Sequence, residues 1–167
     1  DYFINDAFSI ASKSYASTTG FSYLLPTFIG RNFQKNLEIL QEFKNNKTPT
    51  TFILGGKNSD HLIKLIENNN KKQNLFLTTG LFSHLCLREK GVNLGNPNKL
   101  LKEHKLKSNK NFKNILSQEN IITPTDLALS TFGSRDEITL QDFPVYQTIY
   151  DLGNKTIDNY SNIIKKS

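Results

Sequence analysis

TFILGGKNSD, residues 51–60, sets the architecture of this chain. Its apolar start ends in Gly55 and Gly56, which let the backbone turn sharply and approach a ligand closely, because neither carries a Cβ. Good helix N-cap residues follow, and apolar residues then recur at helical spacing. The segment therefore predicts a strand, a glycine turn and a helix.

This junction is suited to an anion. The unpaired N–H groups and the positive dipole end of the predicted helix favour a phosphate at Gly55 and Gly56, and Lys57 adds a mobile positive charge. The segment lacks the GxxxxGKS/T and GxGxxG spacings, however, and such a junction also serves simply to turn a chain. Both interpretations stay open at this point.

Strand-like and helix-like segments alternate after Pro49. The pattern predicts strands over 50–54, 74–79 and 121–129, a looser β-type stretch over 136–150, and helices over 60–71, 81–90, 100–116 and 155–167. A longer amphipathic helix is predicted over 27–46, and Gly91 is a predicted helix C-cap. The alternation indicates an α/β fold, a three-layer Rossmann-like parallel sheet. Ligands of such sheets bind outside the carboxyl ends of the strands, where Gly55, Gly56 and Gly80 fall.

Composition narrows the class of protein. The 167 residues are 37% hydrophobic and include 12 Phe and 6 Tyr, which indicates a globular protein, and no apolar run approaches membrane-spanning length. The single cysteine, Cys86, lies between two leucines and fits a core position in a reducing, cytoplasmic setting. The N-terminus lacks the features of a signal peptide, and the absence of Met indicates a piece of a longer chain.

The net charge of +6 favours anionic partners, either nucleic acid or phosphorylated metabolites. Lysines are spread through Asn-rich segments such as 67–72 and 107–114, and they are not interleaved with aromatics. We therefore interpret these runs as solvated surface and expect no nucleic-acid partner and no membrane. A nucleic-acid-binding α/β module remains a third hypothesis, based on net charge alone.

Six segments match, in order, the motifs of one enzyme family. They are NDAF (5–8), LP…GR (25–31), FILGGKNSD (52–60), TGL (79–81), ITPTDLA (122–128) and IYDLGNKTIDNY (149–160). They resemble NDAF, LPSAAGR, ILGGAKVSD, TGGL, ILPVDVA and IYDIGPKTIEKY of phosphoglycerate kinase, particularly its archaeal branch. The matches span almost the whole chain.

This resemblance implies a glycolytic kinase that transfers a phosphoryl group between 1,3-bisphosphoglycerate and ADP, giving 3-phosphoglycerate and ATP with Mg²⁺. Residues 1–27 would end the phosphoglycerate-binding domain, 28–47 would form the interdomain helix, and 48–167 would begin the nucleotide-binding domain. The metal would be bound mainly through the nucleotide and residues outside this chain. We expect a cytoplasmic monomer, and no activity from this fragment alone.

The resemblance also assigns residues. Lys13 takes the place of an arginine that contacts phosphoglycerate, and Gly55 and Gly56 match the family's glycines in the nucleotide loop. Lys57 is the candidate for the lysine that neutralises charge on the transferring phosphoryl group, although the loop is one residue short. His61 stands where a second lysine is expected.

In the second turn, Thr78 and Thr79 replace glycines and leave Gly80 for close approach to the adenosine. Ile149 and Tyr150 match a segment that borders the adenine pocket. Two further positions have simpler expected roles, Asp126 as a strand-end cap and Asn154 as the cap of the last helix. An alternative to the kinase is a catalytically degenerate homologue that serves as a nucleotide-binding or protein-interaction scaffold.

Overall fold

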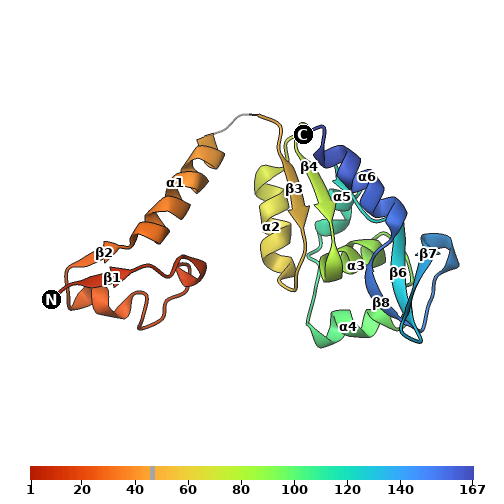
Figure 1. Ribbon diagram of the computed structural model, residues 1–167, viewed down its shortest axis with the longest axis horizontal. Coiled ribbons are helices and arrows are strands. Elements are labelled where there is room, and N and C mark those ends of the chain that lie inside the picture. Colours follow the sequence, from red (N-terminus) through yellow and green to blue (C-terminus); the bar gives the residue numbers. More distant parts are fainter. Residues whose placement is uncertain (46–47) are drawn as a thin grey trace. The chain divides into compact units, whose positions relative to one another are not determined.

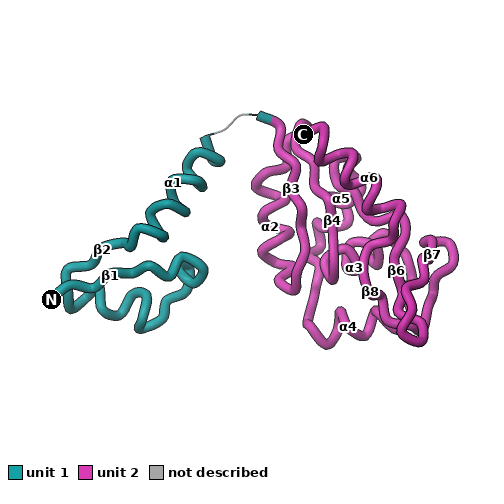
Figure 2. The backbone as a smooth tube through the Cα atoms, viewed as in Figure 1, with its two compact units in different colours: residues 1–48 teal, residues 49–167 magenta. Residues whose placement is uncertain are grey.

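The computed structural model describes residues 1–45 and 48–167 (Figure 1). The chain divides into two compact units, Asp1–Thr48 and Pro49–Ser167 (Figure 2). Within the described residues, no helix combines the length and the apolar character needed to cross a membrane.

The first unit pairs two short strands in parallel. Strand β1 (Phe3–Asn5) lies beside β2 (Thr27–Ile29), and helix α1 (Arg31–Asn45) follows. The helix predicted over 27–46 thus begins later than expected, because the β-branched and aromatic residues 27–29 pair with β1 instead. Its predicted end at Asn46, like the end of the predicted interdomain segment at Lys47, falls outside the described residues, and the division into three segments stays a prediction.

A carboxylate from the end of β1 caps α1. The Asp6 Oδ1 atom accepts a hydrogen bond of 2.7 Å from the Phe33 backbone N–H, and the Gly30 N–H donates to the Asn5 carbonyl at 2.8 Å. A Cβ on Gly30 would lie 2.4 Å from the Asp6 carboxyl group, so only glycine lets these segments approach so closely. The NDAF segment (5–8) and the Gly30-Arg31 pair therefore pack directly against each other at the start of α1.

The second unit contains the parallel sheet that the sequence predicts. Its strand order is β3-β4-β5, with β3 at Thr51–Leu54, β4 at Leu75–Thr78 and β5 at Ile121–Ile122. Helices α2 (Ser59–Asn69) and α3 (Gly80–Glu89) follow the first two strands, and the short helices α4 (Pro97–Glu103) and α5 (Phe112–Leu116) precede the third. The α/β fold is confirmed.

The helix predicted over 100–116 is wrong as a single element, since α4 and α5 are separate. Helix α4 ends in a Schellman motif, in which the Lys105 N–H donates to the Lys102 carbonyl and the Leu106 N–H to the Leu101 carbonyl. Lys105 adopts the left-handed φ of 55° that this motif requires. Gly91, with φ of 95°, ends α3 in the same way, as predicted.

The third strand predicted over 121–129 is also two elements. Strand β5 stops at Ile122, and after Pro124 the chain enters an antiparallel sheet of order β7-β6-β8. A proline lacks the N–H that would continue the ladder, so the apolar run divides there. The bounds are Asp126–Thr131 for β6, Ser134–Thr139 for β7 and Thr148–Leu152 for β8.

Helix α3 lies between two hydrophobic cores. One core packs β3, β4 and β5 against α2 to α5 and includes Phe82 and Leu85, while the other lies under the antiparallel sheet and includes Leu87. This position explains why α3 is buried on all sides. Cys86 belongs to the first core as expected, and burial raises the pKa of its thiol to about 12.

Helix α6 (Asn154–Ile164) closes the second unit. Its Tyr160 hydroxyl lies 3.0 Å from the carbonyl oxygens of Thr78 and Ile122, at the ends of two parallel strands. Burial raises the pKa of Tyr160, so the phenol stays a hydrogen-bond donor. The chain then ends near the start of β3, where the Ser167 and Thr51 hydroxyls are 2.7 Å apart (Figure 1).

Asp126, at the start of β6, caps α6. Its two carboxylate oxygens accept hydrogen bonds from the backbone N–H groups of Lys155 and Thr156, at 3.0 and 2.8 Å, and one also accepts from the Thr156 hydroxyl. The expectation that Asn154 is the cap is wrong, because Gly153 occupies that position and its missing Cβ leaves room for the carboxylate. Asp126 is the strand-end cap that we expected.

Replacing Asp126 by asparagine should destabilise the second unit. The amide would turn an NH₂ group toward N–H donors, which costs about 2 kcal/mol for a buried group of this kind. Urea unfolding followed by circular dichroism measures the loss. Asp158→Asn, on the exposed side of α6, is the matched control and should stay within about 0.5 kcal/mol of the parent; equal effects of both substitutions would contradict this role.

The buried His84 should make stability fall in mild acid. Burial lowers its pKa from 6.5 to about 4, and its Nδ1 atom is buried without a hydrogen-bond partner among the described residues. Between those two pH values the unfolded chain takes up a proton that the folded chain does not, so folding loses stability as the pH falls. The full loss below pH 4 is about 3 kcal/mol.

Urea unfolding at several pH values between 7 and 4 checks this expectation. His84→Leu should flatten the part of the pH dependence that lies in this window, whereas His104→Gln, on an exposed histidine, should leave it unchanged. An unaltered pH profile in the His84 variant would rule the mechanism out.

Candidate functional site

The two glycine turns are tied together at the carboxyl end of the parallel sheet. The Thr79 N–H donates a 2.7 Å hydrogen bond to the Leu54 carbonyl, and the Thr79 hydroxyl donates to the same oxygen at 3.3 Å. A Cβ on Gly55 would lie only 2.5 Å from that hydroxyl oxygen. Gly55 therefore makes room for Thr79, and the turns after β3 and β4 form one edge.

Gly56 and Gly80 leave the backbone of this edge uncovered. Their φ angles are 115° and 54°, in the left-handed region that favours glycine. A Cβ built on either residue would meet nothing within 4 Å. A ligand can therefore approach both backbones closely, as the sequence predicts for a phosphate or nucleotide. Thr79 itself has φ of −137°, so the threonine replacing a glycine needs no left-handed conformation.

The two helices that start here differ as anion sites. In α2, the Asn58 side chain accepts from the His61 N–H at 3.3 Å, as the capping pattern predicts, and Asp60 puts a negative charge in the first turn. In α3, the Thr79 hydroxyl is turned to Leu54 instead of capping the helix. The start of α3 therefore offers an incoming anion less competition than the start of α2.

Lys57 and His61 flank the first turn. Lys57 precedes the Asn58 cap, His61 lies in the first turn of α2, and both side chains are exposed. The arrangement places a lysine side chain and an imidazole beside Gly55 and Gly56. It can neutralise negative charge near the turn, and it contains no nucleophile poised for covalent chemistry among these residues.

The remaining predicted residues lie in other places. Ile149 on β8 is buried in the second core, where its side chain contacts other apolar residues, whereas Tyr150 is 71% exposed. Lys13 lies in the first unit, exposed, in a turn held by a 2.6 Å hydrogen bond from the Thr18 hydroxyl to the Lys13 carbonyl. The structure thus brings together Gly55, Gly56, Lys57, His61 and Gly80.

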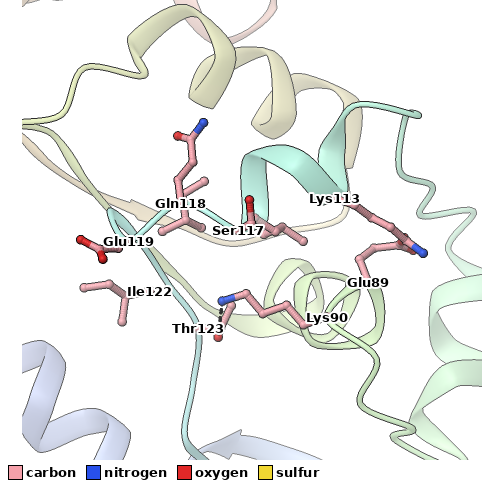
Figure 3. Close-up of a pocket in the computed structure, with 10 residues that line it drawn as sticks. Glu89, Lys90, Lys113, Ser117, Gln118, Glu119, Ile122 and Thr123 are labelled. Atoms are coloured by element: carbon pink, nitrogen blue, oxygen red, sulfur yellow. Dashed lines mark hydrogen bonds between the residues drawn. The ribbon is translucent and has the colours of Figure 1, made fainter.

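A cavity of 620 Å³ lies beside β5, on residues other than the glycine turns (Figure 3). Its charged lining is mixed, and several groups are already engaged: Lys90 donates to the Thr123 hydroxyl at 3.3 Å, and Glu89 pairs with Arg88 at 2.8 Å. Burial lowers the pKa of Lys90. We do not assign this cavity to the nucleotide.

In the two described stretches, 1–45 and 48–167, no group of three or more His, Cys, Asp and Glu side chains could hold a metal ion. The described residues therefore offer no cage of protein ligands for a metal ion, and we derive no step through a bound Mg²⁺.

The sequence did not predict the role of Thr79, which is to tie the two glycine turns together through the Leu54 carbonyl. The signal was present, because a β-branched residue followed a strand where the resemblance expects glycine. Its contact with Leu54 depends on the parallel pairing of β3 and β4, which becomes visible only in the fold.

Parallel strands, glycine turns at their carboxyl ends and helices that start there define an α/β protein whose ligand is expected at that edge. A sequence model of the family described as phosphoglycerate kinase matches residues 1–167. The chain belongs to the phosphoglycerate kinase family.

Relatives and solved structures agree with this assignment. Phosphoglycerate kinase of Methanothermus fervidus is 32% identical over 100% of this chain, and that of Methanococcus maripaludis is 35% identical over 99%. The crystal structure of phosphoglycerate kinase from Pyrococcus horikoshii OT3 superposes with a TM-score of 0.85 at 32% identity, over 99% of this chain and 44% of that one. The structure from Coxiella burnetii, with a TM-score of 0.72 at 20% identity, supports the fold alone.

The chain spans 42% of the length of each of these two curated relatives. It therefore corresponds to less than half of a phosphoglycerate kinase of that length.

Proposed function

We propose that this chain is the part of a phosphoglycerate kinase that supplies two glycine turns to the nucleotide site. ADP or ATP would lie over the backbones of Gly56 and Gly80, with Lys57 and His61 beside the phosphates. Mg²⁺ would arrive with the nucleotide and be held by it and by residues outside this chain. The complete enzyme would be a cytoplasmic monomer that converts 1,3-bisphosphoglycerate and ADP to 3-phosphoglycerate and ATP.

The observation that carries this proposal is the joining of the two turns. The hydrogen bonds from Thr79 to the Leu54 carbonyl hold Gly56 and Gly80 at one edge, with open space at both. Phosphoryl transfer depends mainly on positioning and electrostatic stabilisation, so a rigid edge of backbone with a lysine beside it suits this chemistry.

The other substrate site is represented here by Lys13. A lysine keeps the positive charge needed for phosphoglycerate, but it lacks the planar fork with which arginine binds a carboxylate or phosphate through two hydrogen bonds. Ile149 would support the adenine side of the site from the core, whereas the exposed Tyr150 is available for contact.

A scaffold that binds nucleotide without turning it over is the second candidate. Three features of the chain favour it: the first turn is one residue short, His61 stands where the family has lysine, and Lys13 where it has arginine. Small displacements of the groups that position the reacting atoms can cost orders of magnitude in rate, so these changes weigh against turnover.

The 167-residue chain alone should show no turnover. Neither substrate site is complete in a chain that covers 42% of its relatives, so the reacting groups cannot be positioned. A coupled assay of ATP formation from 1,3-bisphosphoglycerate and MgADP measures this. Turnover above that of a heat-denatured control would contradict the proposal that both substrate sites need residues outside this chain.

The same chain should bind MgADP weakly at the glycine turns. Titration followed by NMR should shift the backbone amide signals of Gly55, Gly56 and Gly80. Lys57→Ala should weaken binding roughly tenfold, since a charge-assisted contact to phosphate is lost. Lys64→Ala, which removes an exposed lysine further along α2, is the control and should change the affinity less than about twofold.

Equal affinities for the parent and Lys57→Ala would remove Lys57 from the site. Shifts confined to residues outside the two turns would overturn the proposed site itself.

A further inference from the structure

A second group of basic side chains lines a cavity of 450 Å³ that the glycine turns do not line. The walls come from Arg88 of α3, Leu101 and Lys102 of α4, and residues 105–108 of the segment that follows. In this lining, all the charged residues that the structure describes are cations, namely Arg88, Lys102, Lys105 and Lys107. The mixed charges of the cavity beside β5 make a clear contrast.

The end of α4 fixes the shape of this cavity. Leu101 and Leu106 are joined by the hydrogen bond from the Leu106 N–H to the Leu101 carbonyl, at 2.9 Å, and both side chains are buried in the first core. Lys105 occupies the left-handed position between them, where glycine is the usual residue and where α3 has Gly91. A lysine is therefore held here at a cost in backbone strain that glycine would avoid.

The lysines are available for a ligand. Among the described residues, the ion pairs are Arg88–Glu89 and Arg135–Glu137, so Lys102, Lys105 and Lys107 belong to none. Arg88 contributes less, because Glu89 partly neutralises it. The negative end of the α4 dipole accounts for a cation at Lys102, but Lys107 lies beyond the helix.

We propose that this cavity binds a compact phosphate-bearing anion with two or more negative charges. Lysine ammonium groups bind phosphate as point charges from several directions, and the cavity volume falls in the range of small-molecule sites. The sequence predicts that residues 107–114 are solvated surface. For Lys107 and Ser108 the proposed site replaces that prediction.

The cavity is also coupled to the start of α2. The Ser59 hydroxyl donates to the Lys107 carbonyl at 2.9 Å and accepts from the Lys107 N–H at 3.2 Å. Ser59 is the first residue of α2 and is buried. An anion that orders residues 105–108 therefore also restrains the helix that follows the first glycine turn.

Titration of the whole 167-residue chain with sodium pyrophosphate, at constant ionic strength, tests the proposal. NMR should show saturable shifts of the amides of residues 101–108 and of Ser59. The variant carrying Lys102→Gln, Lys105→Gln and Lys107→Gln should bind at least about tenfold more weakly. The control carrying Lys64→Gln, Lys165→Gln and Lys166→Gln has the same net charge and should stay within about twofold of the parent.

Lys105→Gly separates binding from helix capping. It should raise the thermal midpoint, because glycine accepts the left-handed φ without strain, and should weaken pyrophosphate binding about threefold. A raised midpoint with unchanged affinity would overturn a ligand role for Lys105.

Other outcomes would overturn the site as a whole. Equal weakening by the two triple variants would mean that only net charge matters. Loss of pyrophosphate binding in Lys57→Ala, with none in the cavity variant, would place the anion at the glycine turns. Tighter binding of a random oligonucleotide than of pyrophosphate, with a steep salt dependence, would indicate a nucleic-acid surface instead.

Discussion

The carboxylate of Asp126 is the contact on which the assembly of the second unit depends. It joins the start of the antiparallel sheet to the start of α6, and α6 in turn places the Tyr160 hydroxyl at the ends of two parallel strands. Without this cap, three backbone and side-chain donors at the start of α6 would lose a charged acceptor. Helix α6 therefore links the two sheets, in addition to α3, which packs into both cores. Asp6 and Gly30 repeat the same design in the first unit, where a strand-end carboxylate and a glycine also fix the start of a helix.

The candidate site also depends on a glycine that makes room for a neighbouring side chain. Gly55 has no side chain, and the hydroxyl of Thr79 takes the space that a Cβ would fill. In the motif that this chain resembles, a glycine is expected where Thr79 stands. Its extended backbone and its bonds to Leu54 show that it fits, while Gly80 keeps the left-handed position. The turn after β4 thus differs in sequence from the family motif, but the backbone of Gly80 stays open to a ligand.

Local patterns predicted the elements that form from local causes. The strand, turn and helix at 51–69, the Asn58 cap and the Gly91 helix end all depend on residues within a few positions of each other. The errors arose where distant or unusual residues decide the outcome. Pro124 splits an apolar run, Lys105 ends a helix without glycine, and the cap of α6 comes from Asp126, 30 positions before Thr156. Family motifs indicated the glycine positions of the site. The hydrogen bonds between its two turns could not be predicted, because they depend on the pairing of β3 with β4.

The burial of Cys86 has a consequence for the chemistry of the folded chain. Its thiol is the single one in the sequence, it belongs to the core on α3, and its pKa of about 12 leaves almost no thiolate at neutral pH. Oxidants and alkylating agents therefore meet an unreactive sulfur as long as α3 stays packed. The rate at which a thiol reagent modifies Cys86 therefore reports how often α3, the helix between the two cores, opens. No label has to be added to the chain for this measurement.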